Sequence, residues 1–324
     1  MITGLSRVVW TQTDRSRPCP LCGGLERITL SNRMQYRLDL KTVICSHCTL
    51  VFTDPPPKQD LYQRFYVEAY AAFYGGIAAS IPRSPSVRPP QRVAWQLDEI
   101  DRLRPIASSR ILEVGPGKGA FLWWAKERGA DVTGLEPSRE FAETLRTSGL
   151  KIVEGPLDDP EVSQLGKFDI VTMFHVLEHF YEPVAALTRI QQLLVTNGLL
   201  AIEVPNILKP FRSLDRYFLR YVHLFQYSLQ TLRLLLAKCG FVILSVDEGS
   251  DDWRNPQSLF VVAQLRSDAQ ACGPTGNPHG ILAHLKAYRH RWWVSGAIRW
   301  HVWRRAVGLR SLGIQLGRII VSPS

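Results

Sequence analysis

Four cysteines near the start of the chain are arranged as two pairs with the spacing of metal ligands. Cys19 and Cys22 form one C-x-x-C turn, and Cys45 and Cys48 form another after a spacer of 22 residues. Four thiolates at such spacing are typical of a tetrahedral zinc site, whose closed shell leaves no open position for catalysis. We therefore predict a structural Zn²⁺ on these four cysteines, with His47 as a bystander between two ligands.

A second group of reactive side chains lies in the segment HVLEH, which contains His175, Glu178 and His179. A histidine with a pKa of about 6.5 can serve as general base toward a hydroxyl. The segment also fits the H-x-x-E-H pattern of inverted zinc peptidases, but that site requires a long internal helix. Three roles stay open: a general base, a ligand set for a divalent ion, or a helix-capping arrangement in which only His175 faces a ligand.

A glycine-rich loop follows an apolar run in the segment ILEVGPGKGAFL. Gly115, Gly117 and Gly119 allow a tight turn and a close approach to a ligand, and the next helix begins with a favourable dipole for an anion. Glu136 lies 21 residues beyond Gly115, where a ribose-binding acid is expected. The loop also fits the dinucleotide fingerprint, so a nicotinamide-dependent oxidoreductase is one alternative.

These groups must be positioned by the strands and helices between them. Short apolar runs alternate with helical segments, which indicates βαβ units and a parallel sheet. The last two runs are joined by a polar loop and predict an antiparallel hairpin at the sheet edge. The seven predicted strands are RILEVG, DVTGLE, LKIVEG, FDIVTMF, LLAIEVP, GFVILSVDEG and SLFVVAQLR. We therefore predict an α/β, Rossmann-like fold whose seven-stranded sheet is mostly parallel.

The order of these motifs resembles that of class I S-adenosylmethionine-dependent methyltransferases. The resemblance rests on an acid two residues before the glycines in EVGPGKG, on the acidic strand end in GLEPS, and on two longer segments. These are FDIVTMFHVLEHFYEPVAALTRIQQLLVTNGLLAIEVPN and HLFQYSLQTLRLLLAKCGF, and the resemblance covers roughly residues 92 to 266. It implies methyl transfer with S-adenosyl-L-methionine as the cofactor.

The resemblance also implies roles for individual residues. Glu136 would accept hydrogen bonds from the two ribose hydroxyls, Glu113 would lie under the methionine amino group, and Asp158 would meet the adenine. The expected cofactor-binding residues are Glu113, Gly115, Gly117, Gly119, Glu136, Asp158, Phe174 and His175. The expected catalytic residues are His175, Glu178, His179 and His223.

Family members that methylate catechol-like quinone precursors carry an E-x-x-E-H metal motif where this chain has HVLEH. His175 stands where their first glutamate would be, so a divalent ion at this segment remains an alternative. Arg212, Arg216 and Arg220 recur at helical spacing after the fifth strand. They would form either a phosphate-binding stripe or a solvated helix face.

The N-terminal segment indicates an acceptor class. A zinc module followed by a tyrosine-rich segment with Tyr66, Tyr70 and Tyr74 resembles the N-terminal part of methyltransferases that act on sugars. We therefore expect O-methylation of a sugar, a polysaccharide precursor or another small molecule, with nucleotide-linked and lipid-linked sugars as candidates. The alternative is a zinc-ribbon nucleic-acid-binding protein or an RNA methyltransferase.

Composition divides the chain into four predicted segments. They are a zinc-binding module over 1–57, a tyrosine-rich lid helix and linker over 58–91, the methyltransferase domain over 92–268 and a basic, tryptophan-rich helical tail over 269–324. The formal net charge is +10, and eight of these positive charges lie after Asp268. Because the rest of the chain is nearly neutral, we expect no nucleic-acid partner.

The basic tail predicts contact with a membrane or lipid-linked substrate, packing on the protein, or nucleic-acid binding, in that order. No apolar run approaches the roughly 18 residues of a membrane-spanning helix. We therefore expect a cytoplasmic protein, with peripheral contact at the inner membrane face through the tail.

Overall fold

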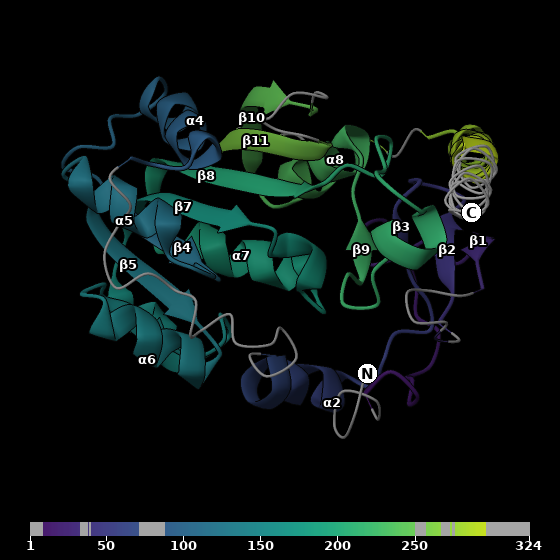
Figure 1. The fold of residues 1–324 in the computed structure, drawn as a ribbon, viewed down its shortest axis with the longest axis horizontal. Helices are drawn as coiled ribbons and strands as arrows, with labels where there is room; N and C mark the ends of the chain where they lie inside the picture. The colour runs from purple at the N-terminus through teal and green to yellow at the C-terminus, as the bar shows by residue number, and fades with distance from the viewer. Residues whose placement is uncertain are drawn as a thin grey trace, which may run out of the picture.

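The computed structural model describes residues 9–32, 38, 40–70, 88–249, 257–266, 273 and 276–295, and its strands form a large and a small sheet (Figure 1). The large sheet has the order β6-β5-β4-β7-β8-β11-β10. Its strands are β4 (Arg110–Val114), β5 (Asp131–Glu136), β6 (Ile152–Glu154), β7 (Phe168–Phe174), β8 (Leu194–Pro205), β10 (Phe241–Asp247) and β11 (Ser258–Leu265). The first five pair in parallel, and β11 is antiparallel to both β8 and β10. The predicted fold class is therefore confirmed.

Helices cover both faces of this sheet, because alternate strand residues point to opposite sides. Ile111 and Ile170 pack on one side against α4 (Gln91–Asp101), α5 (Ala120–Glu127) and α6 (Arg139–Thr147). Leu112 and Val171 pack on the other side against α7 (Pro183–Leu193) and α8 (Leu229–Lys238). The order of the parallel strands reverses direction between β4 and β7, so the carboxyl ends of these two strands form the switch point where ligands bind in such folds.

The small sheet joins the beginning of the chain to its middle. Its order is β1-β2-β3-β9, with β1 (Arg27–Ser31), β2 (Thr42–Cys45), β3 (Val51–Thr53) and β9 (Phe225–Gln226). Strand β3 pairs with β9, and the rings of Phe52 and Phe225 stack at 6.5 Å. Buried residues of both sheets belong to one apolar cluster. The cysteine-containing sheet and the large sheet therefore share one core.

The tyrosine-rich segment forms α2 (Gln59–Arg64) and a π-helical turn, η2 (Phe65–Ala69). The buried Trp10 ring packs edge-on against Tyr62, Phe65 and Tyr221 at 4.7 to 5.7 Å. The rings of Tyr66 and Tyr70 stack at 5.0 Å, as the four-residue spacing predicted. Tyr74 lies outside the described residues.

A helix over 278–295 represents the described part of the tail. Leu285 is fully buried and belongs to a cluster with Leu30 and Phe218, and Arg289 pairs with Asp215 at 2.7 Å. This part of the tail therefore packs on the protein, and Trp293 is 72% exposed. Two further tryptophans of the basic tail, at positions 300 and 303, lie outside the described residues. Within the described part of the chain, no helix has the length and apolarity needed to cross a membrane.

Candidate active site

The glycine loop connects β4 to α5 in a backbone conformation that favours glycine. Gly115, Gly117 and Gly119 have φ angles of 65°, 56° and 70°. A Cβ atom on Gly115 would come within 2.8 Å of a methyl group of Val176, so this position cannot take a side chain without a shift. A Cβ on Gly117 would meet no atom of the described residues within 4 Å. The loop thus presents bare backbone to open space, as a ligand cradle requires.

Two buried acids lie at the carboxyl ends of the neighbouring strands β4 and β5. Glu113 is 3% exposed and Glu136 is 5% exposed. Glu136 accepts a hydrogen bond from the Ser138 amide at 3.0 Å, while Oε2 of Glu113 has no partner among the described residues. Burial raises the pKa of Glu113 well above its usual range and that of Glu136 to about 7. Both acids thus have acceptor capacity for a ligand that supplies hydroxyl or ammonium donors.

The raised pKa of Glu136 predicts how the ligand-free chain responds to pH. A carboxyl group that binds its proton more tightly in the folded chain stabilises the fold below its unfolded pKa of 4.5, and this contribution is lost as the pH rises through about 7. We expect Glu136→Gln to be more stable than the unaltered chain at pH 8, by a value of order 3 kcal/mol, and equal to it near pH 4. Urea unfolding at both pH values measures the difference, and a variant without this pH dependence would contradict the assignment.

Asp158 and Phe174 stay predictions as cofactor contacts. Asp158 is exposed in the turn after β6, and the adjacent Asp159 instead caps η4 (Pro160–Leu165) by accepting a hydrogen bond from the Glu161 amide. Phe174 ends β7, with its ring 5.0 Å from that of Phe121 and 6.2 Å from that of Phe260. Neither side chain has a contact that assigns it to a ligand.

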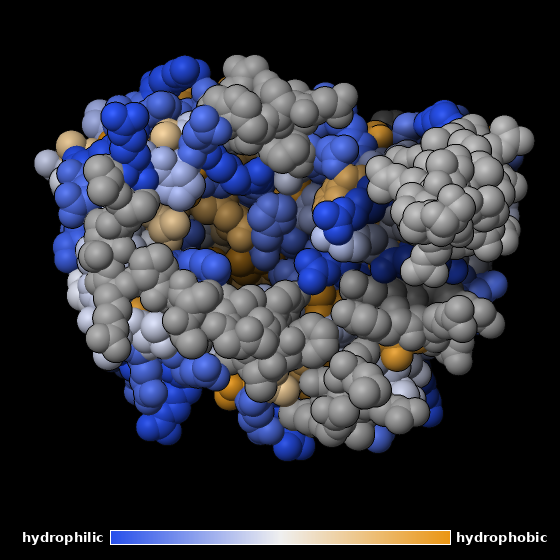
Figure 2. All heavy atoms as spheres, in the orientation of Figure 1, coloured by the Kyte–Doolittle hydropathy of each residue, from blue (hydrophilic) through white to orange (hydrophobic). Residues whose placement is uncertain are grey.

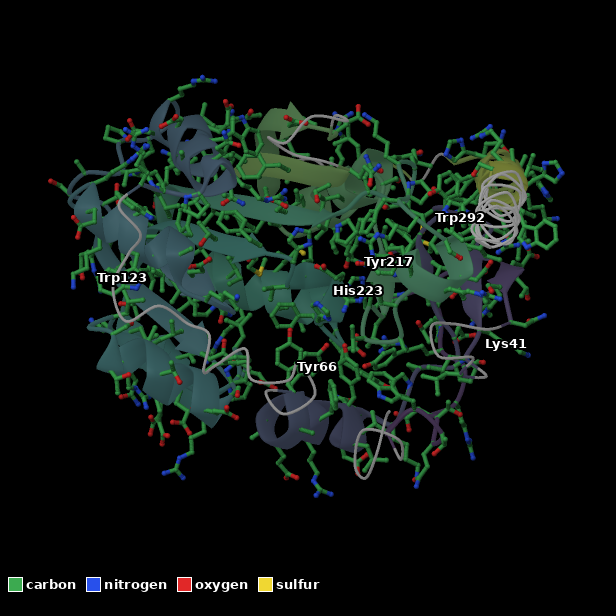
Figure 3. The ribbon with its side chains drawn as sticks, viewed as in Figure 1. Lys41, Tyr66, Trp123, Tyr217, His223 and Trp292 are labelled. Atoms are coloured by element: carbon green, nitrogen blue, oxygen red, sulfur yellow. The ribbon has the colours of Figure 1, made fainter. Side chains whose placement is uncertain are left out.

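The four predicted catalytic residues lie together. Glu178, in η5 (Leu177–His179), is 1% exposed, and its Oε1 is 3.5 Å from Nδ1 of His175. The same oxygen is 4.0 Å from Nε2 of His179 and 4.0 Å from Nε2 of His223. His223 comes from the loop before β9 and lies between the two sheets, near Tyr217 in the view of Figure 3. The inverted zinc peptidase alternative does not fit, because η5 has three residues and is no long helix.

Burial keeps two of these histidines neutral. It lowers the pKa of His179 and lowers that of His223 further. Nδ1–H of His179 donates a hydrogen bond to the Val222 carbonyl at 2.8 Å, which leaves Nε2 with a lone pair. Neutral imidazoles of this kind can accept a proton or bind a metal ion.

Glu203 is a site residue that our sequence analysis missed. It is fully buried in β8, where Gln96 donates a hydrogen bond to it at 2.7 Å and Nε2 of His175 lies at 2.8 Å. Arg92 from α4 forms an ion pair with the same carboxylate. The signal in the sequence was an acid inside the otherwise apolar run LLAIEVP. This network fixes His175, whose backbone has a φ of 58°.

A pocket of about 360 Å³ opens over the histidines. It is lined by Tyr70, His175, His179, Pro205, Phe211, Tyr217, Phe218, Arg220, His223 and Ser258. Its volume and its mixture of aromatic and polar groups are those of small-ligand sites. Figure 2 shows a hollow in this face of the molecule, with hydrophobic side chains at its floor and hydrophilic ones around it.

The predicted arginine stripe is not on one helix. The only helical turn there, among the described residues, is η6 (Leu214–Phe218), which ends at Leu219, where ψ reaches 80°. Arg212 precedes the turn with a φ of 56° and lies over the Tyr217 ring at 4.3 Å. Arg220 follows the turn and lines the pocket. The helical turn is therefore too short to carry all three arginines on one helix face.

The four cysteines of the small sheet also come together. Sγ of Cys19 is 3.5 Å from that of Cys48, and Sγ of Cys22 is 3.5 Å from that of Cys45. All four sulfur atoms lie within 4.8 Å of one another. Zinc–sulfur bonds of about 2.3 Å in a tetrahedron separate the sulfurs by about 3.8 Å, so the cluster fits one ion.

Comparison with known proteins shows what the large domain is similar to. Residues 90–246 match a family model described as a methyltransferase domain. The match covers just under half of the chain and includes the parallel strands β4 to β8 of the large sheet. Among solved structures, it is similar to an S-adenosylmethionine-dependent methyltransferase from Mesorhizobium loti, at 20% identity and a TM-score of 0.44 over 54% of this chain and 100% of that one.

Curated relatives bear on the substrate. The tRNA U34 carboxymethyltransferase of Psychromonas ingrahamii is 31% identical over 172 residues, which cover 49% of this chain and 52% of that protein. The enzyme of the same name from Vibrio cholerae is 30% identical over 174 residues, covering 48% of this chain and 53% of the relative. This chain thus spans about half the length of these curated relatives.

These relatives overturn our prediction that nucleic acid is no partner, because their name specifies a tRNA substrate. The prediction used the net charge of the whole body, whereas phosphate contacts depend on local charge. Arg212 and Arg216 are exposed beside the pocket in a part of the chain that is neutral overall. The sugar acceptor has no support among these relatives.

Proposed function

We propose that this chain is an S-adenosylmethionine-dependent methyltransferase that modifies a nucleoside of RNA. The observation that carries the acceptor class is the similarity to tRNA-modifying enzymes over about half of the chain. The relatives transfer a carboxymethyl group according to their name, so the transferred group is part of the test below. The RNA methyltransferase was the alternative in our sequence analysis, and it now replaces the small-molecule acceptor.

The proposed cofactor site is formed by the glycine loop and the two buried acids. Glu136 accepts hydrogen bonds from the ribose hydroxyls, and its burial excludes water that would compete for them. The unpartnered oxygen of Glu113 accepts a donor from the amino-acid end of the cofactor. The backbone at Gly117 borders the open space that the cofactor would fill.

The proposed acceptor site is the aromatic pocket. A base that leaves its stack needs an aromatic surface and polar groups at its edge, and Tyr70, Phe211 and Tyr217 provide the surface. Arg220 lies in the pocket, while Arg212 and Arg216 are exposed beside it, where phosphate groups would pass.

The proposed role of the histidines is to orient the acceptor and take its proton. The cofactor supplies an activated methyl group, so the chain mainly has to align the acceptor atom with that group and exclude water. His175 lines the pocket with His179 and His223, and we assign to it the role of accepting the proton that the nucleophile loses. Glu203 holds His175 at the edge of the same pocket.

We also propose that Cys19, Cys22, Cys45 and Cys48 hold a structural Zn²⁺. The support is the approach of all four sulfur atoms to within 4.8 Å and the position of Cys45 in β2, at the centre of the small sheet. No ligand position would remain open for a substrate.

The acceptor class is tested by methyl transfer from radiolabelled S-adenosylmethionine to bulk tRNA and, separately, to a nucleic-acid-free pool of small metabolites. We expect label in the tRNA that ribonuclease releases as a modified nucleoside, with a mass gain of one CH₂ group. Transfer to tRNA only when a carboxymethyl-bearing sulfonium donor replaces S-adenosylmethionine would contradict the transferred group but not the acceptor. Label only in small molecules would overturn the acceptor, and the absence of both cofactor binding and transfer would overturn the methyltransferase proposal.

Tyr217→Ala tests whether the pocket binds the base. Stacking on one aromatic side chain contributes about 1–3 kcal/mol, so we expect the KM for tRNA to rise about tenfold or more with cofactor affinity unchanged. Leu244→Ala is the matched control, because Leu244 is an exposed large side chain on β10 outside the pocket. Equal KM values for the two variants would contradict this location of the acceptor site.

A further inference from the structure

Glu178 is a buried carboxylate that lacks the partners such a group requires. It is 1% exposed, and neither of its oxygens has a hydrogen-bond partner among the described residues. Burying a charged carboxylate costs free energy unless a counter-ion or hydrogen bonds compensate for it. The side chain therefore points to a cation that completes the site.

Two imidazole nitrogens face the same space as this carboxylate. A carboxylate oxygen of Glu178 and one nitrogen each of His179 and His223 all lie within 4.8 Å of one another. The His179 and His223 rings meet edge to face at 4.7 Å, and buried Nδ1 of His223 has no hydrogen-bond partner in the described part of the chain. These three residues come from two separate segments, η5 and the loop before β9, which only the fold brings together.

Hydrogen bonds orient the His179 ring in the way that they orient a histidine that binds a metal ion. Its Nδ1 is 2.8 Å from the Val222 carbonyl, an arrangement that fixes the tautomer and directs Nε2 toward Glu178. The Tyr62 hydroxyl is bonded to the carbonyls of both His179 and Val222, at 2.8 and 3.0 Å. One buried tyrosine thus holds together the two segments that carry the histidines.

His175 is not a member of this set. Its Nε2 lies against the Glu203 carboxylate at 2.8 Å, and although its Nδ1 is 3.5 Å from Oε1 of Glu178, His175 is not in the group whose ligand atoms all lie within 4.8 Å of one another. The ligand set therefore departs from the E-x-x-E-H pattern, which would use positions 175, 178 and 179, since His223 takes the place of the first ligand.

We propose that Glu178, His179 and His223 bind a divalent transition-metal ion at the floor of the pocket. Two imidazoles and one carboxylate suit Zn²⁺, Fe²⁺, Co²⁺ or Mn²⁺, whereas Mg²⁺ and Ca²⁺ prefer oxygen ligands. Three protein ligands leave coordination positions open, and both histidines line the pocket, so an oxygen atom of the occupant can complete the shell. Coordination of an oxygen atom of the occupant rests on the proposed function, whereas binding of the ion by the three side chains does not.

The test separates this ion from the one at the cysteine cluster. The full chain is first loaded with one equivalent of Zn²⁺, which the four thiolates bind in preference to the two imidazoles and the carboxylate, and is freed of unbound zinc. It is then titrated with Mn²⁺, a harder ion that does not displace zinc from sulfur. Electron paramagnetic resonance of free Mn²⁺ counts the bound ion. We expect about one Mn²⁺ per chain, at least a tenfold weaker affinity in Glu178→Gln, and unchanged binding in Glu143→Gln, which alters an exposed acid on α6.

Thermal unfolding provides a second readout. Glu178→Gln removes an unpartnered carboxylate and keeps its shape, so without Mn²⁺ it should unfold at the temperature of the unaltered chain or above it. An ion that binds only the folded state should raise the unfolding temperature of the unaltered chain and of Glu143→Gln but not that of Glu178→Gln. Absence of an Mn²⁺ site in the unaltered chain, or equal binding in Glu178→Gln, would overturn the proposal. Methyl transfer to RNA is scored separately, so either proposal can fail alone.

Discussion

Glu136→Ala is expected to weaken the binding of S-adenosylmethionine about a hundredfold while the chain stays folded. In the proposed site, the carboxylate accepts hydrogen bonds from two ribose hydroxyls, and bonds to a charged group contribute about 1.5–3 kcal/mol each. Loss of both corresponds to a hundredfold or larger change, since each factor of ten in affinity is about 1.4 kcal/mol. The fold should persist, because the substitution removes a buried acid whose burial raises its pKa to about 7.

Isothermal titration calorimetry with the cofactor measures this loss directly. Glu154→Ala is a matched control, because Glu154 is the residue paired with Glu136 across β5 and β6 but is exposed to solvent. We expect the control to bind the cofactor as the unaltered chain does. If Glu136→Ala bound as tightly as Glu154→Ala, the cofactor would not contact this strand end, and the proposed site would be wrong.

The large sheet was predictable because its strands carry their own signal. Parallel strands covered on both faces are nearly continuous apolar runs, and glycines or polar turns end each of them. Strand β9 has no such signal, because Phe225 and Gln226 are two residues whose partner strand, β3, lies far earlier in the chain. Its pairing depends on tertiary contacts such as that of Phe52 with Phe225.

The candidate site was predictable only in part. HVLEH and His223 could be named from residue types, and the fold brings them together. Their division of roles could not be predicted, because it depends on Glu203 engaging His175 and on the Val222 carbonyl engaging His179. The prediction of an arginine stripe on one helix was wrong for a related reason. The spacing of the arginines predicts a continuous helix, but the backbone ends the helical turn at Leu219.

Removal of zinc is expected to unfold the small sheet and to leave the cofactor site folded. A structural zinc contributes about 10–16 kcal/mol to folding of small domains, which exceeds what the short strands β1, β2 and β3 can supply alone. The large sheet has its own core on the face of α4, α5 and α6, which includes no cysteine ligand. Cofactor affinity should therefore change little when the metal is lost.

Methyl transfer, in contrast, should be lost with the zinc. Strand β9 pairs with β3, and the loop before β9 carries His223, so the acceptor side of the site depends on the small sheet. Cys48→Ser should lower the zinc content by about one ion per chain and abolish amide-exchange protection at Val43, Phe52 and Phe225. It should keep S-adenosylmethionine binding within a fewfold of the unaltered chain.

Cys239→Ser is the matched control for this prediction. Cys239 is a buried thiol in the turn after α8 and is not a member of the cysteine cluster, so its replacement should leave the zinc content unchanged. Zinc content and hydrogen exchange are measured on the same preparations of both variants. Full zinc content in Cys48→Ser would refute the ligand set. Loss of cofactor binding together with zinc would show that the two sheets unfold as one unit. The core that the sheets share would then contribute more to the stability of the large sheet than the separate core under α4, α5 and α6.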